Sequence, residues 1–331
     1  MRALVLHREE ERSDGAGGVR ASVETASPVS AGPVEVAVRY SSVNYKDGLA
    51  VTGRGKVVRG EFPFVAGIDL VGEVVSSDDD RFAKGDVVVG TGGGLGETIW
   101  GGYAERAFPD PEYLVRLPSA IDPVHAMAVG TAGVTAMLSV LALDSGRASR
   151  AGEVLVTGAS GGVGSWAVGL LAASGYRIAA STGSSDAHEY LKHLGAHAII
   201  HRDELASGPA RPLDSAVWSG AVDTVGGATL AAVISRIGRH GTIVACGNAG
   251  GHEFTSSVFP FILRGVRLMG IDSNTSPAEE RTRVWSRLAE LIPRLPVDDM
   301  FNIISLADVP DAAERILRGD VRGRLVVDVN A

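Results

Sequence analysis

A glycine-rich segment at residues 153–164, with the sequence EVLVTGASGGVG, has the residue types and spacing of a phosphate-binding turn. An apolar run of strand length, Val154–Thr157, ends abruptly in glycines, and an apolar helix is expected over Val163–Ala173. Gly161 permits a tight turn and a close backbone approach, and Gly164 lets the helix pack against the strand. The N–H groups at the start of that helix would be free to bind a pyrophosphate.

This spacing indicates a dinucleotide cofactor and therefore redox chemistry. Ala159 stands at the first position of the G-x-G-x-x-G fingerprint, so the match is inexact. A turn that needs glycines only for its own geometry is the alternative interpretation. The predicted phosphate-binding residues are Ser160, Gly161, Gly162 and Val163.

The end of the next strand bears on the choice between NAD and NADP. NAD enzymes place an acidic residue there, which binds the ribose 2′-hydroxyl and would repel a 2′-phosphate. The strand expected at 177–182 is followed by no acid before Asp186, which is interpreted as the N-cap of the next helix. Small hydroxyls and open backbone N–H groups suit a phosphate, so NADP(H) is the predicted cofactor. The residues expected at this phosphate are Ser181, Thr182, Gly183 and Ser184.

Strand and helix patterns divide the chain into two parts that would position these residues. Residues 1–125 consist of short strand-like runs separated by Gly, Pro and Asp clusters, without long helical periodicity. An apolar helix expected over Ala126–Leu143 then leads into alternating strands and helices, which predict a parallel sheet covered by helices on both faces. Strands of this part are expected at 177–182, 196–200, 219–226, 241–247 and 266–273.

The C-terminal part returns to the pattern of the N-terminal part. Helices are expected from Ala278 to about Leu291 and through Ala313–Arg318, followed by a strand with the sequence RLVVDV. The predicted fold class is α/β, with a Rossmann doubly wound parallel sheet in residues 126–273. A compact β-barrel-like domain of residues 1–125 would be completed by about 274–331.

Length and charge exclude several classes of protein. The chain has 331 residues, 45% of them hydrophobic, which is enough for two domains with their own cores. The net charge of -8 argues against a nucleic acid or an anionic membrane surface as partner. Glycine or charge interrupts the apolar runs well short of ~20 residues, so no membrane span is expected.

The N-terminus and the cysteine content favour a cytoplasmic protein. The first residues, MRALVLHREEERSDG, carry charges in place of the apolar region of a signal peptide. The one cysteine, Cys246, cannot form an internal disulfide, which fits a reducing compartment. Cys246 lies in an apolar run and is expected in the core of a strand.

The chain resembles the zinc-free medium-chain dehydrogenases/reductases of the quinone-oxidoreductase-like branch, and most of all the NADPH-dependent acryloyl-CoA reductases. This resemblance implies a GroES-like barrel made from both termini, a Rossmann domain, and an active site in the cleft between them. The segments that carry it span the chain: SSVNYKDGLAVTGRGKVVRG (41–60), GIDLVGEV (67–74), WGGYAE (100–105), GTAGVTAML (130–138), VTGASGGVGS (156–165), HEYLKHLGA (188–196), GAVDTVGG (220–227), FPFILRGVRLMGIDS (259–273) and GR (323–324).

Metal content can be predicted by comparison with the zinc-containing relatives. Those alcohol dehydrogenases hold catalytic zinc with thiolate and imidazole ligands around a G-H-E segment, and structural zinc with four cysteines. The corresponding segment here is Gly67-Ile68-Asp69, in which isoleucine replaces the histidine, and Cys246 is the only cysteine. No metal site is predicted.

The candidate catalytic residues lie between Val43 and Asp47. Reduction of an α,β-unsaturated thioester requires hydride delivery to Cβ, donors for the enolate oxygen and a proton for Cα. Tyr45 is the candidate proton donor, and packing on the nicotinamide without donating a proton is the alternative. Asn44 is expected to donate to the carbonyl or simply to cap a turn. Lys46 and Asp47 are expected to pair with each other or with nearby backbone.

The resemblance also implies further cofactor contacts. Relatives usually carry an arginine where this chain has Ser184. Arg202 matches another phosphate-contacting position and could supply the positive charge that Ser184 lacks, and Lys192 is a second candidate. Thr131 is expected beside the nicotinamide, with a helix-start cap as its alternative role. The other expected cofactor contacts are Tyr45, Asn248, Ile262, Ser273 and Arg324.

Three functions remain open at this point. An NADPH-dependent reductase of acryloyl-CoA comes first, an NADPH:quinone reductase second, and a non-catalytic NADPH-binding protein third. Arg54, Lys56 and Arg59 could bind the phosphorylated end of coenzyme A or form a solvated turn. The segment 266–272 could pair with its copy in a homodimer, as in related dimers.

Overall fold

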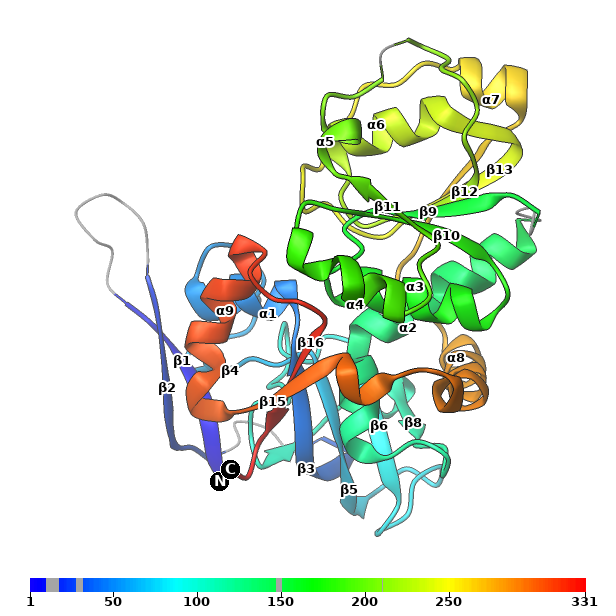
Figure 1. Cartoon of the computed structure of the whole chain (residues 1–331). Coiled ribbons are helices and arrows are strands. Elements are labelled where there is room, and N and C mark those ends of the chain that lie inside the picture. Colours follow the sequence, from blue (N-terminus) through cyan, green and yellow to red (C-terminus); the bar gives the residue numbers. More distant parts are fainter. Residues whose placement is uncertain (10–17, 28–31, 147–150, 210) are drawn as a thin grey trace. The chain divides into compact units, whose positions relative to one another are not determined.

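The computed structural model of this chain describes residues 1–9, 18–27, 32–146, 151–209 and 211–331 (Figure 1). The described residues form two compact units. Residues 10–15 of the charged N-terminal segment, on which the signal-peptide expectation partly rests, lie outside the described residues. The predicted domain boundaries near 125 and 273 stay a prediction. Unit 1 comprises Met1–Val134, Ser273–Ala289 and Val297–Ala331, and unit 2 comprises Thr135–Asp272 and Glu290–Pro296.

Unit 1 is built around a sheet in which the last strand of the chain returns to its N-terminal part. Strand β3 (Val34–Val43) pairs antiparallel with β5 (Asp69–Ser77) and also with β16 (Arg324–Asp328). The seven-stranded sheet has the order β15-β16-β3-β5-β6-β8, and β7 pairs with β3. Its other strands are β6 (Val87–Thr91), β7 (Arg106–Ala107), β8 (Leu114–Arg116) and β15 (Phe301–Ser305).

A smaller sheet and two helices complete the core of unit 1. The smaller sheet has the order β2-β1-β4. In β3 the alternate residues Val34, Val36 and Val38 are buried, which is the period of a strand with one face on the core. Helix α1 packs against α9 so closely that a Cβ at Gly48 would lie 2.9 Å from Ile316 Cγ2. These elements are β1 (Arg2–Arg8), β2 (Val19–Thr25), β4 (Phe64–Val65), α1 (Tyr45–Thr52) and α9 (Val309–Arg318).

Helix α8 (Ala278–Leu291) is fixed to the sheet of unit 1 by a buried arginine. The Arg281 guanidinium donates to the carbonyl oxygens of Thr91, at 2.5 Å, and Asn274, at 2.7 Å. It also lies over the ring of Tyr113. A buried guanidinium is stable only when such acceptors replace its water, so α8 has little freedom to shift.

Helix α2 (Pro123–Ser145) is broken at Gly130, whose φ of 46° and ψ of -159° are not helical. The range of α2 confirms the apolar helix expected over Ala126–Leu143. Its length and composition would also suffice to cross a membrane, contrary to the expectation that every apolar run stops short of that length. Because 89% of its most apolar stretch is buried inside the structure, α2 is accounted for as a core helix.

Unit 2 contains the predicted parallel sheet. Its strand order is β11-β10-β9-β12-β13-β14, and every neighbouring pair is parallel. The order reverses between β9 and β12, where folds of this kind bind ligands beyond the carboxyl ends of the strands. The strands are β9 (Glu153–Val156), β10 (Arg177–Thr182), β11 (Ala198–His201), β12 (Trp218–Asp223), β13 (Ile237–Ala245) and β14 (Arg267–Gly270).

Helices of unit 2 follow the strands as the alternation predicts. Helix α6 (Gly227–Arg236) buries Leu230, Val233 and Ile234 in a cluster with residues of the sheet. The other helices are α3 (Gly162–Ala173), α4 (His188–His193), α5 (Asp203–Ala206) and α7 (Phe259–Arg264). Short 3-10 turns occur at Pro111–Tyr113, Ser185–Ala187, Ile292–Arg294, Val297–Asp299 and Leu306–Asp308.

Two local expectations in unit 2 are wrong. Asp186 is not the N-cap of α4, because it lies inside the 3-10 turn Ser185–Ala187 and Ala187 occupies the cap position. Cys246 lies just after β13 rather than within it, and is half-buried. Burial raises the pKa of the Cys246 thiol to about 12, so the thiolate needed for a reactive cysteine does not form at neutral pH.

Candidate functional site

The glycine-rich turn of unit 2 has the close packing that a dinucleotide-binding turn requires. Gly158 has a φ of +58°, and a Cβ at Gly164 would lie 2.2 Å from the Gly158 carbonyl oxygen. A Cβ at Gly161 would meet only that oxygen, at 3.4 Å, so the backbone there borders open space. Gly161 is the N-cap of α3, and the N–H groups of that helix start at this open position. The turn therefore offers a pyrophosphate both room and donors.

Thr182, Gly183 and Ser184, three of the residues predicted to bind a 2′-phosphate, lie beside Ser160 and Arg202 at the end of β10. Ser160 Oγ lies 3.0 Å from Thr182 Oγ1, which also accepts a hydrogen bond from the Ser184 N–H. The Arg202 side chain lies over Gly183, since a Cβ at Gly183 would be 2.5 Å from Arg202 Nε. The guanidinium side chain is 74% exposed, and its Nε lies 3.8 Å from an oxygen of Asp203. Arg202 is thus adjacent to Ser184, although Arg202 follows β11 and Ser184 follows β10.

The second candidate cation for this phosphate is placed differently. Lys192 lies in α4, and its ammonium donates to Glu189 over 2.8 Å on the exposed surface of the helix. The geometry therefore favours Arg202 over Lys192 as the cation next to the end of β10.

A buried carboxylate links the two strands between which the sheet order reverses. Asp223, at the end of β12, accepts hydrogen bonds from Thr157 Oγ1 at 2.7 Å and from the Gly226 N–H at 2.8 Å. Burial raises the pKa of Asp223 above its ordinary value. Thr224 Oγ1 in turn donates to the Thr157 carbonyl oxygen. These contacts fix the end of β12 beside the start of the glycine-rich turn.

The predicted catalytic segment begins helix α1 in unit 1. Tyr45 is the first residue of α1, and its side chain is 44% exposed. Asn44 is the N-cap and is buried. Its Nδ2 donates to Asp47 Oδ2 at 3.1 Å and to Asp69 Oδ2 at 2.8 Å. Asn44 occupies the N-cap of α1, as the turn-capping alternative has it, and both hydrogens of its amide have carboxylate acceptors. Donation to a substrate stays a prediction.

The expected pairing of Lys46 with Asp47 is wrong. Lys46 Nζ instead donates to Glu97 Oε1 at 2.7 Å, and Arg59 donates to the other oxygen of Glu97 at 2.6 Å. Glu97 is almost fully buried and so attracts both cations. Asp47 is bound by nearby backbone, as the other expectation has it, because its carboxylate accepts from the N–H groups of Asn44 and Ile68.

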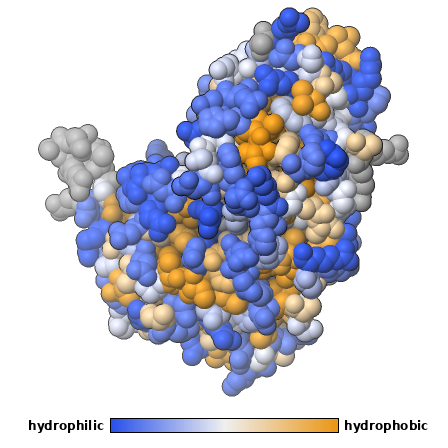
Figure 2. Space-filling view, in the orientation of Figure 1, coloured by the Kyte–Doolittle hydropathy of each residue, from blue (hydrophilic) through white to orange (hydrophobic). Residues whose placement is uncertain are grey.

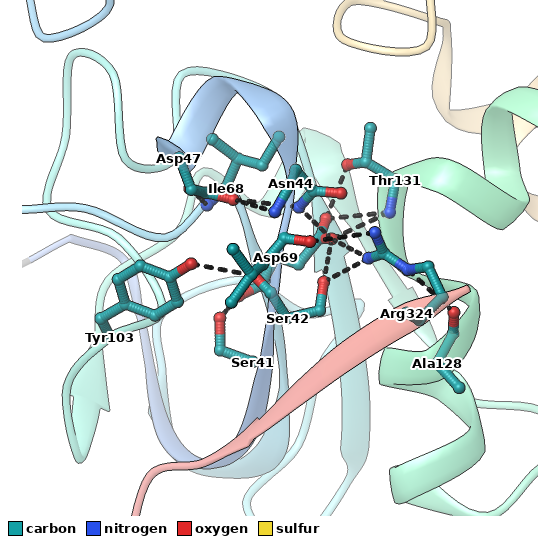
Figure 3. Close-up of polar contacts among 11 residues, drawn as sticks. Ser41, Ser42, Asn44, Asp47, Ile68, Asp69, Tyr103, Ala128, Thr131 and Arg324 are labelled. Atoms are coloured by element: carbon teal, nitrogen blue, oxygen red, sulfur yellow. Dashed lines mark hydrogen bonds and ion pairs between the residues drawn. The ribbon is translucent and has the colours of Figure 1, made fainter. Parts of the chain in front are cut away.

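Asp69 is the centre of the polar network shown in Figure 3. Its buried carboxylate accepts from Ser42 Oγ at 2.6 Å, as well as from Asn44. It also accepts from both the backbone N–H and the hydroxyl of Thr131, the latter at 2.6 Å. The Arg324 guanidinium lies 3.7 Å from it. Thr131 therefore starts the second half of α2 with Asp69 as its cap, close to the helix-start alternative expected for it.

Arg324 is buried within unit 1, with 2% of its side chain exposed. Its nitrogens donate to Ser42 Oγ and to the carbonyl oxygens of Val43 and Ala128. The acceptors of this guanidinium are therefore protein groups, and a direct contact with a cofactor stays a prediction.

The remaining predicted contacts lie apart from these networks. Asn248 is exposed in the loop after β13, and Ile262 is 69% exposed on α7. Ser273 follows β14, and its carbonyl oxygen accepts from Arg281. Among the basic residues near Tyr45, Arg54 is paired with Glu314 and Arg59 with Glu97, whereas Lys56 is exposed.

Asp47 lies close enough to the carboxylate of Asp69 for its own ionisation to be affected. Burial, and then the charge of Asp69, raise the pKa of Asp47 to about 7. Burial likewise raises the pKa of Tyr103 well above its ordinary value, so the phenol, whose hydroxyl donates to the Ser42 carbonyl oxygen, stays protonated. The sequence gives no signal that Asp69 gathers these donors, because the Gly67-Ile68-Asp69 segment bears there only on the question of a metal site. In the part of the chain that the structure describes, no group of three or more His, Cys, Asp or Glu side chains could hold a metal ion.

Two family models match the two parts of the chain. The model described as alcohol dehydrogenase GroES-like domain matches residues 30–119, and the model described as zinc-binding dehydrogenase matches residues 162–290. Together with the parallel sheet of unit 2, these matches define a medium-chain dehydrogenase/reductase with a GroES-like domain and a Rossmann-type domain, and the predicted fold class is confirmed.

Full-length relatives narrow this class. The chain is 47% identical to the acrylyl-CoA reductase AcuI of Ruegeria pomeroyi, with 99% of each chain covered. The yhdH oxidoreductase of Salmonella enterica, solved in complex with NADP, superposes with a TM-score of 0.94 at 45% identity, covering 99% of each chain. The Bacillus subtilis protein yhfP, solved with NAD bound, has a TM-score of 0.93 at 42% identity, with 99% of this chain and 98% of that one covered. The chain belongs to the family of the acrylyl-CoA reductases AcuI.

We expect the pKa of Asp47 to make the stability of unit 1 depend on pH. Its folded pKa of about 7 lies above the ordinary aspartate value of 3.8, so its contribution to stability is fully present below pH 4 and is lost as pH rises towards 7. In urea unfolding of the wild type and of Asp47→Asn, the free energy of unfolding of the wild type relative to the variant should fall by more than about 1 kcal/mol between pH 4.5 and 7.5. A difference that stays constant over this range would contradict the assignment.

Proposed function

We propose that this protein is an NADPH-dependent reductase of acryloyl-CoA. The reaction transfers a hydride from NADPH to Cβ of the acryloyl group and a proton to Cα, which gives propanoyl-CoA and NADP+. The single observation that carries this proposal is the 47% identity with an acrylyl-CoA reductase over 99% of both chains. The contacts in both units are consistent with it.

The residues of unit 2 fit the cofactor. The N–H groups at the start of α3 face open space at Gly161, where the pyrophosphate would bind. Ser184 and Arg202 at the end of β10 would bind the 2′-phosphate, since a hydroxyl and a guanidinium both suit phosphate oxygens. The cofactor supplies the hydride, and the protein supplies its binding and orientation.

The residues of unit 1 fit a role in proton supply and in placing the thioester. Tyr45 carries a phenol at the start of α1 that is 44% exposed and so accessible to a substrate. We infer that this phenol, or a water that it orients, protonates Cα while donors nearby stabilise the enolate oxygen. Thr131 would lie beside the nicotinamide. Asn248, Ile262, Ser273 and Arg324 stay proposed neighbours of the cofactor.

A homodimer in the cytoplasm is part of the same proposal. Strand β14 is the edge of the parallel sheet, and Leu268 in it is 36% exposed. Apolar side chains of α7 and the residue before it are exposed as well: Val258, Phe259, Ile262 and Leu263. Figure 2 shows apolar surface where Figure 1 places α7. Exposed apolar area next to an open sheet edge favours pairing with a second copy, and a single species of monomer mass in sedimentation velocity would exclude it.

The function is tested by NADPH oxidation with acryloyl-CoA, crotonyl-CoA and small quinones assayed in parallel. We expect kcat/KM to be highest for acryloyl-CoA, with propanoyl-CoA as the product detected by mass spectrometry. Faster turnover of quinones would support a quinone reductase instead. Binding of NADPH without turnover of any of these substrates would leave a non-catalytic cofactor-binding protein.

Removal of the guanidinium at the end of β10 should abolish the preference for NADPH. In Arg202→Ala we expect the KM for NADPH to rise about tenfold or more, because a charge-assisted hydrogen bond to the 2′-phosphate is lost. The KM for NADH should stay within about twofold of the wild type. Lys192→Ala is the matched control, and an equal effect of the two variants would refute the role of Arg202.

Replacement of the Tyr45 phenol distinguishes proton donation from packing. Tyr45→Phe keeps the ring, so a loss of kcat of about 10²-fold with acryloyl-CoA is expected if the hydroxyl protonates Cα. A solvent deuterium isotope effect on kcat should change in the variant for the same reason. Unchanged kcat with only a higher KM for NADPH would assign Tyr45 to cofactor binding.

A further inference from the structure

Four residues from three segments distant in sequence surround the single carboxylate of Asp69, three as hydrogen-bond donors and one as a neighbouring cation. Ser42 and Asn44 come from the end of β3, Thr131 from the break in α2, and Arg324 from the start of β16. Figure 3 shows these side chains converging on the carboxylate.

Burial makes this carboxylate intolerant of any lost donor. Asp69 is fully buried, and a buried charge must have hydrogen-bond donors or an opposite charge in place of water. Three side-chain donors and the Thr131 N–H contact it within 3.1 Å, and Arg324 adds a positive charge at 3.7 Å. Displacement of one donor therefore disturbs the positions of the others.

The groups that Asp69 holds adjoin the two predicted contacts with the nicotinamide. Asn44 is the N-cap of α1, so fixing its amide fixes the start of the helix that carries Tyr45. Thr131 is held through both its N–H and its hydroxyl. The lack of a side chain at Gly130 makes these contacts possible, because a Cβ at this position would lie 2.5 Å from Asp69 Oδ2. One carboxylate thus sets the positions of both Tyr45 and Thr131.

We propose that Asp69 is a positioning residue for hydride transfer, which sets the placement of Tyr45 and Thr131 around the nicotinamide without itself touching the substrate. This inference rests on the proposed function, since it assumes a nicotinamide at Thr131. Ser42 acts with Asp69 in this role, because its hydroxyl donates to Asp69 Oδ2 and accepts from Arg324. The segment that holds zinc ligands in other dehydrogenases then has a different task in this chain.

Two neighbouring serines provide a matched test. Ser42 Oγ donates to the Asp69 side chain and Ser41 Oγ to the Asp69 carbonyl oxygen, both at 2.6 Å, and both serines are fully buried. Ser42→Ala and Ser41→Ala therefore remove equivalent buried hydroxyls with comparable expected losses in Tm. The measurements are kcat and KM with acryloyl-CoA, and the Kd values of NADPH and 2′,5′-ADP by titration calorimetry. Asp69→Asn, which keeps the side-chain shape, is measured alongside.

We expect kcat of Ser42→Ala to fall at least fivefold with the KM for acryloyl-CoA within about twofold, and the Kd for NADPH to rise at least threefold. Asp69→Asn, where folded, should show the larger effect. Ser41→Ala should keep the wild-type kcat, and 2′,5′-ADP, which lacks the nicotinamide, should bind all variants equally. Equal kcat and NADPH affinity in Ser41→Ala and Ser42→Ala would overturn the proposal, as would a parallel loss of 2′,5′-ADP binding.

The outcome is separable from that of the proposed function. A wild type that binds NADPH but does not reduce acryloyl-CoA would refute the substrate, while the two Kd values would still decide the role of Asp69. A wild type that does not bind NADPH would overturn both proposals.

Discussion

The burial of one negative charge is the constraint on which unit 1 depends. Asp69 lies where water cannot reach it, so the fold has to supply its hydrogen bonds from the protein. Its donors come from β3 and α2, and the cation beside it comes from β16. A carboxylate shared in this way ties the sheet to the helix more specifically than apolar packing alone, since apolar contacts tolerate small displacements and short hydrogen bonds to a buried charge do not. The local order of the start of α1 follows from the same contacts.

In unit 2, glycines fix the positions of neighbouring elements, as the buried carboxylate of Asp69 does in unit 1. The glycines at 158 and 164 let α3 approach the turn, and Gly183 leaves space for the Arg202 side chain. A methyl group at Gly164 would collide with backbone, whereas one at Gly183 would meet a flexible side chain. Gly164 is therefore required for the fold itself, and Gly183 for the position of the Arg202 guanidinium. Both kinds of close approach lie where the phosphates of the cofactor are proposed to bind.

Local patterns were sufficient to predict the architecture, while long-range polar pairing was not. The glycine turn, the helix at 278–291 and the alternation of strands and helices follow from neighbouring residues, and the structure has them. The sequence predicts that Lys46 pairs with Asp47 or with nearby backbone, but its partner Glu97 is 51 residues away. Nothing in the sequence around Asp69 reveals Thr131 or Arg324 as its partners, because both are more than sixty residues away. Asp186 was misplaced because a 3-10 turn precedes α4.

The pairing of β16 with β3 has a consequence for the order of events during protein synthesis. All six strands of the unit 2 sheet have been translated by residue 270, so that sheet can form while the C-terminal residues are still in the ribosome. The seven-stranded sheet must wait for β16 (Arg324–Asp328), which is translated after all the strands of the unit 2 sheet. Until then the edge of β3 that pairs with β16 is open, and Asp69 lacks the guanidinium of Arg324 beside it.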